Sequence, residues 1–205
     1  GNNYKFFLII FKLISNLTFH NTNLLPMEYV IDLLNIFDAI LTLDKNTDDL
    51  LHEMLNILIN LIETSEKFKQ KIFDSNFLKK NFKNFKKIYK SGTRVILYKF
   101  INKLTENIKF GNATEIIKFN FFEFCVDALL KKCTNEVYNV LRSLRNLFDS
   151  CEFLKSLNSN NVNAFMKLFS EKGGKSALEG LVNHPNNDIY ILANGIFKEM
   201  EIYEL

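Results

Sequence analysis

The chain has 205 residues, of which 47% are hydrophobic and 24% charged, and its net charge is +3; these values describe an ordinary globular protein and exclude a disordered or collagen-like chain. Only 7 glycines and 2 prolines occur, whereas a sandwich or barrel of short strands needs a turn about every 8 to 12 residues, so the composition favours helices. No apolar run approaches the roughly 18 residues of a membrane-spanning helix.

The first predicted element is a helix over residues 4–20. Its apolar run 6–11 is short for a signal peptide, Lys12 interrupts it, and no cleavage site of small residues follows, so a secretory signal is not expected. Further along, Cys125, Cys133 and Cys151 cannot all pair with one another, and their spacing does not match zinc ligands. We therefore expect reduced thiols in an intracellular protein.

An asparagine recurs inside apolar helical segments along the whole chain. Asn16, Asn60, Asn102 and Asn146 are separated by 44, 42 and 44 residues, and Asn194 follows after a looser step of 48. Helical units of about 40 to 47 residues are typical of HEAT and armadillo repeats, which bury their apolar faces against their neighbours. The sequence thus predicts one all-α domain over 1–205, folded as an armadillo-type right-handed superhelical solenoid of about four to five repeats.

Each repeat is predicted to contain three helices, the last of which is long and carries the asparagine. Two shorter amphipathic segments precede it, at 66–73 and 76–89 in one repeat and at 113–119 and 121–132 in the next. Polar pauses at 45–47, 91–93, 133–135 and 183–187 supply capping residues, and each is expected to open a long third helix. The resulting plan is a leftover third helix at 4–20, followed by repeats at about 24–64, 65–110, 112–150 and 160–203. We expect an array that starts on a third helix to be cut at its amino end and to expose an apolar face there.

Charge is segregated along the chain. Residues 21–64 contain eight acidic residues and one lysine, a balance of −7, whereas residues 65–103 contain twelve basic and two acidic residues, a balance of +10. The lysines between 79 and 90 lie opposite phenylalanines at helical spacing, which indicates a solvated outer face. Binding of nucleic acid or an anionic membrane by this block is the alternative.

Residues 179–193, EGLVNHPNNDIYILA, together with Lys172, Gly173 and Gly174, resemble the closing repeat of the importin α (karyopherin α) family. Residues 68–75, FKQKIFDS, are similar to a family segment that follows an asparagine-bearing helix. The similarity continues in register along the chain and covers about the sixth to tenth repeats of that family, with divergent residues.

The resemblance implies a nuclear import adaptor whose third helices form a concave face for an extended, lysine-rich nuclear localisation signal. In that family asparagines bond the peptide backbone, tryptophans stack on lysine stems and carboxylates complement the ammonium groups. In this chain Tyr98 and Asn56 stand where tryptophans are usual, and Val95 replaces a glutamate. The implied minor signal pocket consists of Lys12, Asn16, Glu53, Asn56, Asn60, Tyr98 and Asn102.

The same resemblance implies further partners. Glu199, Glu201 and Glu204 would contact the export receptor that returns importin α to the cytoplasm, and importin β would bind a segment that precedes this sequence. Cargo proteins with localisation signals are the main expected partners, and the expected location is the cytoplasm and the nucleus. No membrane partner or small-molecule substrate is expected.

Two other functions stay open. The chain could be an armadillo scaffold that binds another protein and keeps its asparagines only to fix the register of its repeats, or a basic solenoid that binds nucleic acid. An enzyme is not expected, because the segment 52–56, HEMLN, lacks the second histidine of a zinc-peptidase motif and no nucleophile–base signature occurs. No metal or cofactor is expected.

Overall fold

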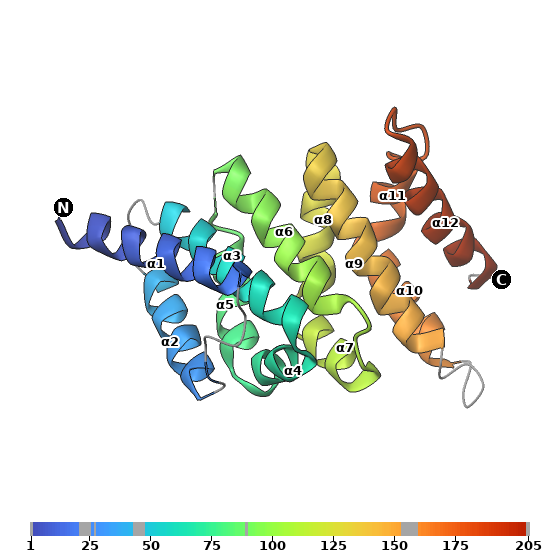
Figure 1. Ribbon diagram of the computed structural model, residues 1–205. Helices are drawn as coiled ribbons and strands as arrows, with labels where there is room; N and C mark the ends of the chain where they lie inside the picture. Colours follow the sequence, from blue (N-terminus) through green and yellow to red (C-terminus); the bar gives the residue numbers. More distant parts are fainter. Residues whose placement is uncertain are drawn as a thin grey trace. The chain divides into compact units, whose positions relative to one another are not determined.

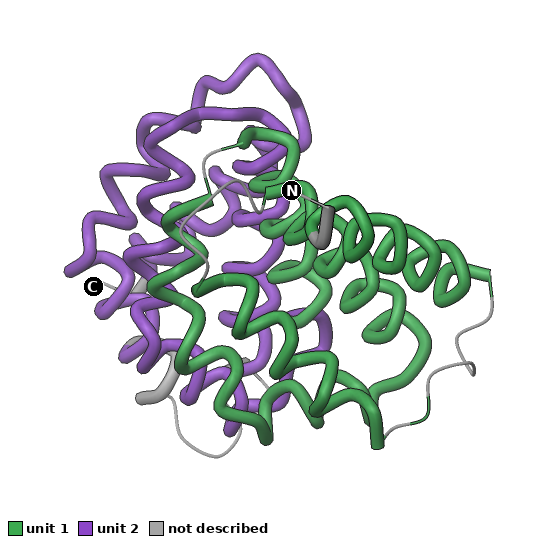
Figure 2. Tube along the Cα trace, turned by 90° about the vertical axis from the view of Figure 1, so that its left-hand side faces the viewer, with its two compact units in different colours: residues 1–104 green, residues 105–205 purple. Residues whose placement is uncertain are grey.

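The computed structural model describes residues 2–20, 26, 28–42, 48–88, 90–152 and 160–203. Within these residues the chain forms twelve α-helices and no strand (Figure 1). The helices group into two compact units, residues 1–104 and residues 105–205 (Figure 2). We call them unit 1 and unit 2.

Unit 1 is built from layers of short and long helices. Its elements are α1 Asn2–His20, α2 Tyr29–Thr42, α3 Asp48–Thr64, α4 Glu66–Asp74, α5 Phe77–Phe85 and α6 Ser91–Thr105, of which the last residue belongs to unit 2. The long helix α1 packs along α3, and α2 packs against α3, α4 and α5.

Two serine side chains determine where the short helices of unit 1 begin and end. Ser65 caps α4 by accepting a hydrogen bond from the backbone N–H of Lys67 at 3.3 Å. Ser75 then makes the turn into α5, because its hydroxyl donates to the carbonyl of Ile72 at 2.7 Å and accepts from the N–H of Phe77 at 3.3 Å. These two serines separate α4 and α5 from their neighbours without a proline or glycine.

Unit 2 contains two groups of three helices. Its elements are α7 Phe110–Ile117, α8 Phe121–Lys131, α9 Thr134–Glu152, α10 Asn160–Glu171, α11 Gly174–Glu179 and α12 Asn187–Tyr203. Asn186 caps α12, since its side-chain oxygen accepts from the N–H groups of Asp188 and Ile189 at 3.0 and 3.1 Å.

Phenylalanine forms much of the core in each unit. In unit 1 the rings of Phe37 and Phe77 meet edge to face with centroids 5.1 Å apart. In unit 2, Phe169 is fully buried, and its ring lies 5.3 Å from that of Phe122 and 6.0 Å from that of Phe148. Phenylalanine rings therefore fill much of the space between the helices of each unit.

The helices follow the predicted repeats closely. The groups α4–α5–α6, α7–α8–α9 and α10–α11–α12 each contain three helices and lie near the repeats predicted at 65–110, 112–150 and 160–203, whose bounds stay a prediction. The repeat predicted at 24–64 contains α2 and α3, with 43–47 and most of 21–27 outside the described residues. Three predicted pauses extend into the helices that they open. Residues 91–93 lie wholly inside α6, because the turn that precedes it is made at 86–88, whereas Thr134 and Asn135 begin α9 and Asn187 begins α12. The pause predicted at 45–47 lies outside the described residues. The single domain over 1–205 stays a prediction.

Candidate functional site

The three asparagine-bearing helices of unit 1 lie side by side and run in the same direction (Figure 1). Asn60 on α3 reaches α1 near its end, and Tyr4 near the start of α1 reaches Asp49 at the start of α3. At the next interface the hydroxyl of Thr93 on α6 donates to the carbonyl of Asp48 at 3.2 Å. Lys103 pairs with Glu63 at 3.1 Å at the far end of the same two helices. Residues one repeat apart therefore stand at matching heights on neighbouring helices.

Hydrogen bonds fix the orientation of the Asn60 amide. Its Nδ2 donates to the carbonyl of Ser15 at 3.1 Å and to Oγ1 of Thr18 at 3.2 Å. The single hydroxyl proton of Thr18 is directed to the carbonyls of Ile14 and Ser15, at 2.9 and 3.0 Å, so Oγ1 is an acceptor for Asn60. A carbonyl oxygen and this hydroxyl both require the Nδ2 end of the amide. The Oδ1 end therefore points away from α1.

The other asparagines of the row differ in exposure. Asn16 is exposed on α1 and Asn102 is half-buried on α6. In unit 2, Nδ2 of Asn146 lies 3.4 Å from Oγ1 of Thr105, so an asparagine again bonds a threonine of the preceding third helix. This recurring bond supports the register role that the sequence left open for the asparagines.

The remaining residues of the predicted pocket differ in how far their side chains are exposed. Glu53 and Asn56 are half-buried on the polar face of α3 that carries Asn60, and Lys12 is exposed on α1. Tyr98 does not fit its predicted role, because its side chain is only 3% exposed and offers no ring face to a lysine. Tyr98 precedes Asn102 by four residues, which suggested that both side chains point outward. In the structure the Tyr98 side chain is instead part of the core.

Acidic and basic blocks of the sequence neutralise each other within unit 1. The pairs join residues 40 to 42 positions apart: Lys80 with Asp38 at 3.4 Å, Lys90 with Asp49 at 2.8 Å and Lys103 with Glu63 at 3.1 Å. A hydrogen bond from Lys90 lowers the pKa of the Asp49 carboxyl below its ordinary value, and the same contact raises the pKa of the Lys90 ammonium. The basic block is thus partly a counterion of the preceding repeat, which weakens the nucleic-acid interpretation.

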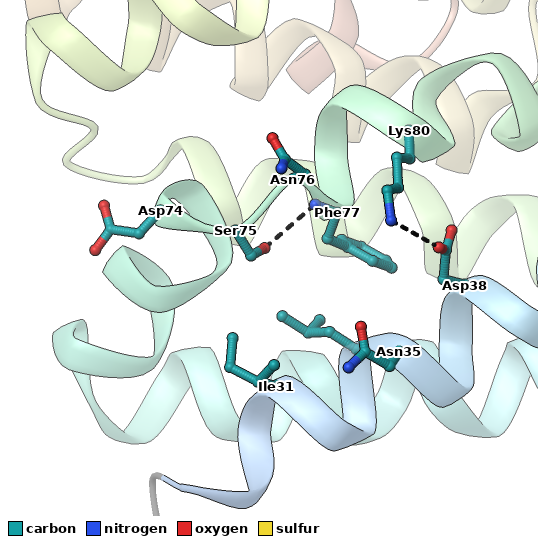
Figure 3. A pocket seen from close by; sticks show the side chains of 9 residues that line it. Ile31, Asn35, Asp38, Asp74, Ser75, Asn76, Phe77 and Lys80 are labelled. Carbon is teal, nitrogen blue, oxygen red and sulfur yellow. Dashed lines mark hydrogen bonds and ion pairs between the residues drawn. The ribbon is translucent and has the colours of Figure 1, made fainter.

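A small cleft opens between α2 and the turn from α4 to α5 (Figure 3). It has a volume of about 290 Å³, with Ile31, Leu34 and Phe77 as its apolar lining. The ion pair of Asp38 and Lys80 lies at one end of the view and Asp74 at the other. Asp38 also accepts a hydrogen bond from the buried amide of Asn81 at 2.9 Å, so its carboxylate holds α5 on α2.

The predicted export-receptor contacts lie in unit 2. Glu199 on α12 forms an ion pair with Arg145 on α9, and Arg145 also pairs with Asp149 at 2.8 Å. Glu199 therefore joins two helices of its own chain and is only 27% exposed. Glu201 is exposed, and Glu204 lies outside the described residues.

The part of the chain that the structure describes brings together no group of three or more His, Cys, Asp or Glu side chains that could hold a metal ion. None of its helices combines the length and the apolar character needed to cross a membrane.

Comparisons with known proteins identify the fold. No protein-family model and no curated protein matches the sequence. Among solved structures, an engineered protein is similar over 98% of this chain and 77% of its own, with a TM-score of 0.72 and 14% identity. A second engineered protein covers 96% of this chain and 90% of its own (TM-score 0.58, 12% identity), and a designed armadillo repeat protein covers 94% and 92% (TM-score 0.55, 13% identity). The predicted all-α armadillo-type fold, with about four repeats, is confirmed, whereas membership of the importin α family stays a prediction.

Proposed function

We propose that this armadillo-type scaffold binds an extended segment of another protein across the third helices α1, α3 and α6 of unit 1. The observation that carries the proposal is the orientation of Asn60, whose Nδ2 is held by α1 while Oδ1 points away from it. Asn16 and Asn102 stand at the matching positions of the neighbouring helices. An extended peptide presents backbone N–H groups at regular intervals, and a row of amide oxygens is a suitable acceptor for them.

The ligand we propose is a lysine-rich segment of the nuclear localisation type, which would make the chain an import adaptor. Glu53 supports this choice, because its half-buried carboxylate lies two turns before Asn60 on the same face of α3. Lys12 on α1 and Lys99 on α6 are exposed, and both would repel an ammonium group of the ligand. The favourable position for that group is therefore beside α3, where Glu53 lies. The proposal includes cargo proteins as partners and passage between cytoplasm and nucleus.

The affinity of this face for a peptide is expected to be low. Each hydrogen bond from an asparagine contributes about 1 kcal/mol net, whereas a micromolar dissociation constant requires about 8 kcal/mol after the entropy of the peptide is lost. Tyr98 adds no stacking energy, because its ring is buried. We therefore expect dissociation constants weaker than micromolar for a single peptide.

Peptide titration tests the proposal. A fluorescent peptide with two lysine clusters and its lysine-to-alanine counterpart are titrated by anisotropy with the wild type, with the double variant Asn16→Ala and Asn102→Ala, and with Glu53→Gln. Loss of two amide bonds should weaken binding roughly 10-fold or more. Asn35→Ala serves as a control, because Asn35 is an exposed asparagine on α2.

The outcomes separate the two candidate functions. An adaptor binds the lysine peptide more tightly than the alanine peptide, and Glu53→Gln reduces that preference. A scaffold without specificity for localisation signals binds both peptides equally and loses both through the asparagine double variant. Binding that the double variant leaves unchanged would reject the asparagine face altogether.

A further inference from the structure

Lysines cover the outer side of α5 and of the turn that follows it. The segment 77–88 contains no acidic residue, and its five lysines are all exposed: Lys79, Lys80, Lys83, Lys86 and Lys87. The apolar side of the helix is turned inward, because Phe77, Phe82 and Phe85 are buried. Helix α5 is an internal element of unit 1 and packs on α2 and α4.

The ion pairs of unit 1 leave part of this lysine surface unneutralised. They use Lys69, Lys80, Lys90 and Lys103. Among the residues that the structure describes, no carboxylate pairs with Lys79, Lys83 or Lys87, which we call the lysine row. At a rise of 1.5 Å per residue, Lys79 and Lys83 stand about 6 Å apart on one side of α5, and Lys87 follows in the next turn of the chain.

The cleft between α2 and the turn from α4 to α5 adjoins this lysine surface. Phe77 and Lys80 at the start of α5 both line it, and Ile31 of α2 faces Ser75 and Phe77 across its opening (Figure 3). Its volume of about 290 Å³ is at the lower limit of ligand pockets, roughly 300–1,000 Å³. The cleft therefore suits an apolar side chain of a partner better than a cofactor.

From these two features we propose that α2 and α5 bind an acidic segment of a partner protein, with one apolar side chain in the cleft and carboxylates along the lysine row. An extended chain places every second side chain on one side at intervals of about 6.6 Å, close to the spacing of Lys79 and Lys83. Asp38 already makes this kind of contact, because its carboxylate lies 3.4 Å from the Lys80 ammonium and accepts a hydrogen bond from Asn81. None of these residues belongs to the asparagine face on α1, α3 and α6.

A protein segment fits this surface better than a nucleic acid or a membrane does. Helix α5 has no exposed aromatic ring to stack on a base and no arginine to form paired bonds with a phosphate. It also exposes none of the large apolar side chains that helices at a membrane surface insert. Asp32 on α2 and Asp74 on α4 are exposed, so a polyanion that extends beyond α5 would meet carboxylates.

Titration of the full chain with short synthetic peptides tests the proposal. The probe is a fluorescent peptide in which one leucine precedes alternating glutamates, and its counterparts replace either the glutamates by glutamine or the leucine by serine. Lys79→Glu with Lys83→Glu reverses charge on the lysine row, and Ile31→Asn makes the cleft polar. Lys131→Glu with Lys167→Glu is the matched control, because both are exposed lysines of unit 2 and the change in net charge is the same. Anisotropy measures binding, and circular dichroism measures helicity.

We expect the wild type and the control to bind the acidic leucine peptide alike, and less tightly as salt is added. The row variant should weaken this binding roughly 10-fold or more, and glutamine in place of glutamate should weaken it as well. Ile31→Asn should weaken the leucine peptide and leave the serine peptide unchanged. The comparison of leucine and serine peptides on the wild type tests the cleft whether or not Ile31→Asn folds.

Four results would overturn the proposal. They are a wild type that binds none of the peptides, a leucine peptide that binds no more tightly than its serine counterpart, equal losses in the control and the row variant, and tighter binding of a single-stranded oligonucleotide of the same charge. The last result would identify the lysine surface as a site for nucleic acid.

Discussion

The two ends of the Asn60 amide face different surroundings. Its Nδ2 donates to Ser15 and Thr18 of α1, which fixes the register of two neighbouring repeats. Its Oδ1 points away from that helix. From the sequence alone, fixing the repeat register and binding a peptide are alternative roles for this asparagine. One side chain can have both roles, because the bonds from Nδ2 to α1 fix the orientation in which Oδ1 can accept a bond from a peptide.

Removing the threonine acceptor tests the register bond. Thr18→Val keeps the shape of a side chain that is 2% exposed and leaves Nδ2 of Asn60 with Ser15 as its remaining partner. We expect the free energy of unfolding to fall by about 1 kcal/mol, measured as a lower urea midpoint at an unchanged slope. Thr42→Val is the control, because Thr42 bonds only within its own helix, to Ala39. Equal losses in both variants would contradict the inter-repeat role.

The contact between Asp49 and Lys90 predicts how stability depends on pH. The pKa of Asp49 is lowered in the folded chain, mainly by the hydrogen bond from Lys90, so folding favours the ionised carboxylate. The stabilisation is complete above the ordinary aspartate pKa of about 3.9 and is lost as pH falls through the lower folded value. Both side chains are more than half exposed, so the effect is small and decreases with added salt.

Asp49→Asn should therefore make the urea midpoint less sensitive to pH between about 5 and 2.5 than it is in the wild type. Asp32→Asn is the matched control, because Asp32 is an exposed acid in the first turn of α2. A wild-type acid response in Asp49→Asn would show that the pair contributes nothing to stability in solution.

The sequence could place the asparagines but not their neighbours. Spacing alone identifies Asn16, Asn60 and Asn102 as equivalent positions. It does not show that Tyr98 is buried, because Asn102, one turn further along α6, is itself half-buried, and packing against the neighbouring helices decides which side chains at the edge of such a face are covered.

At the level of elements, the charge blocks pair across one repeat. Asp38, Asp49 and Glu63 belong to α2 and α3, and their lysine partners follow 40 to 42 residues later. The sequence showed both blocks and the repeat length of 42 to 44 residues. The charge blocks and the repeat length together are sufficient to predict these pairs, whereas the basic block considered alone left the binding of polyanions as an alternative.

The turn between α10 and α11 depends on two glycines with different requirements. Gly173 adopts φ = 88°, the left-handed region that favours glycine. A Cβ on Gly174 would lie 2.5 Å from three ring atoms of Phe169, which is fully buried. The sequence suggested a family motif at these positions, and the structure supplies a packing reason for it.

Gly174→Ala should lower the free energy of unfolding by about 1 to 3 kcal/mol, because the added methyl group overpacks the phenylalanine cluster. Gly92→Ala is the matched control: it lies in α6 with nothing within 4 Å of its added Cβ, so it should be neutral or stabilising by up to about 1 kcal/mol. Thermal and urea unfolding measure both. Equal effects in the two variants would show that the ring of Phe169 relaxes without cost.

For the molecule as a whole, recurrence was the informative signal. Four asparagines at nearly constant intervals were sufficient to predict a helical repeat array, because each repeat packs in the same way on the next, and the amphipathic segments between them indicated the two shorter helices. The apolar face that the sequence predicts on the first helix is exposed on α1, at Phe6, Ile9, Leu13 and Leu17.

The two units each have a phenylalanine core of their own, which predicts local rather than uniform effects of destabilising substitutions. In a repeat array, stability is a sum over repeats and nearest-neighbour interfaces, so Gly174→Ala should reduce amide protection mainly in α10, α11 and α12. Thr18→Val should do so mainly in α1 and α3, where its bond to Asn60 lies. Hydrogen exchange followed by mass spectrometry of peptides from each helix measures both under native conditions. If either variant reduced protection equally in every helix, the 205 residues would unfold as one cooperative unit and the division into units 1 and 2 would have no energetic meaning.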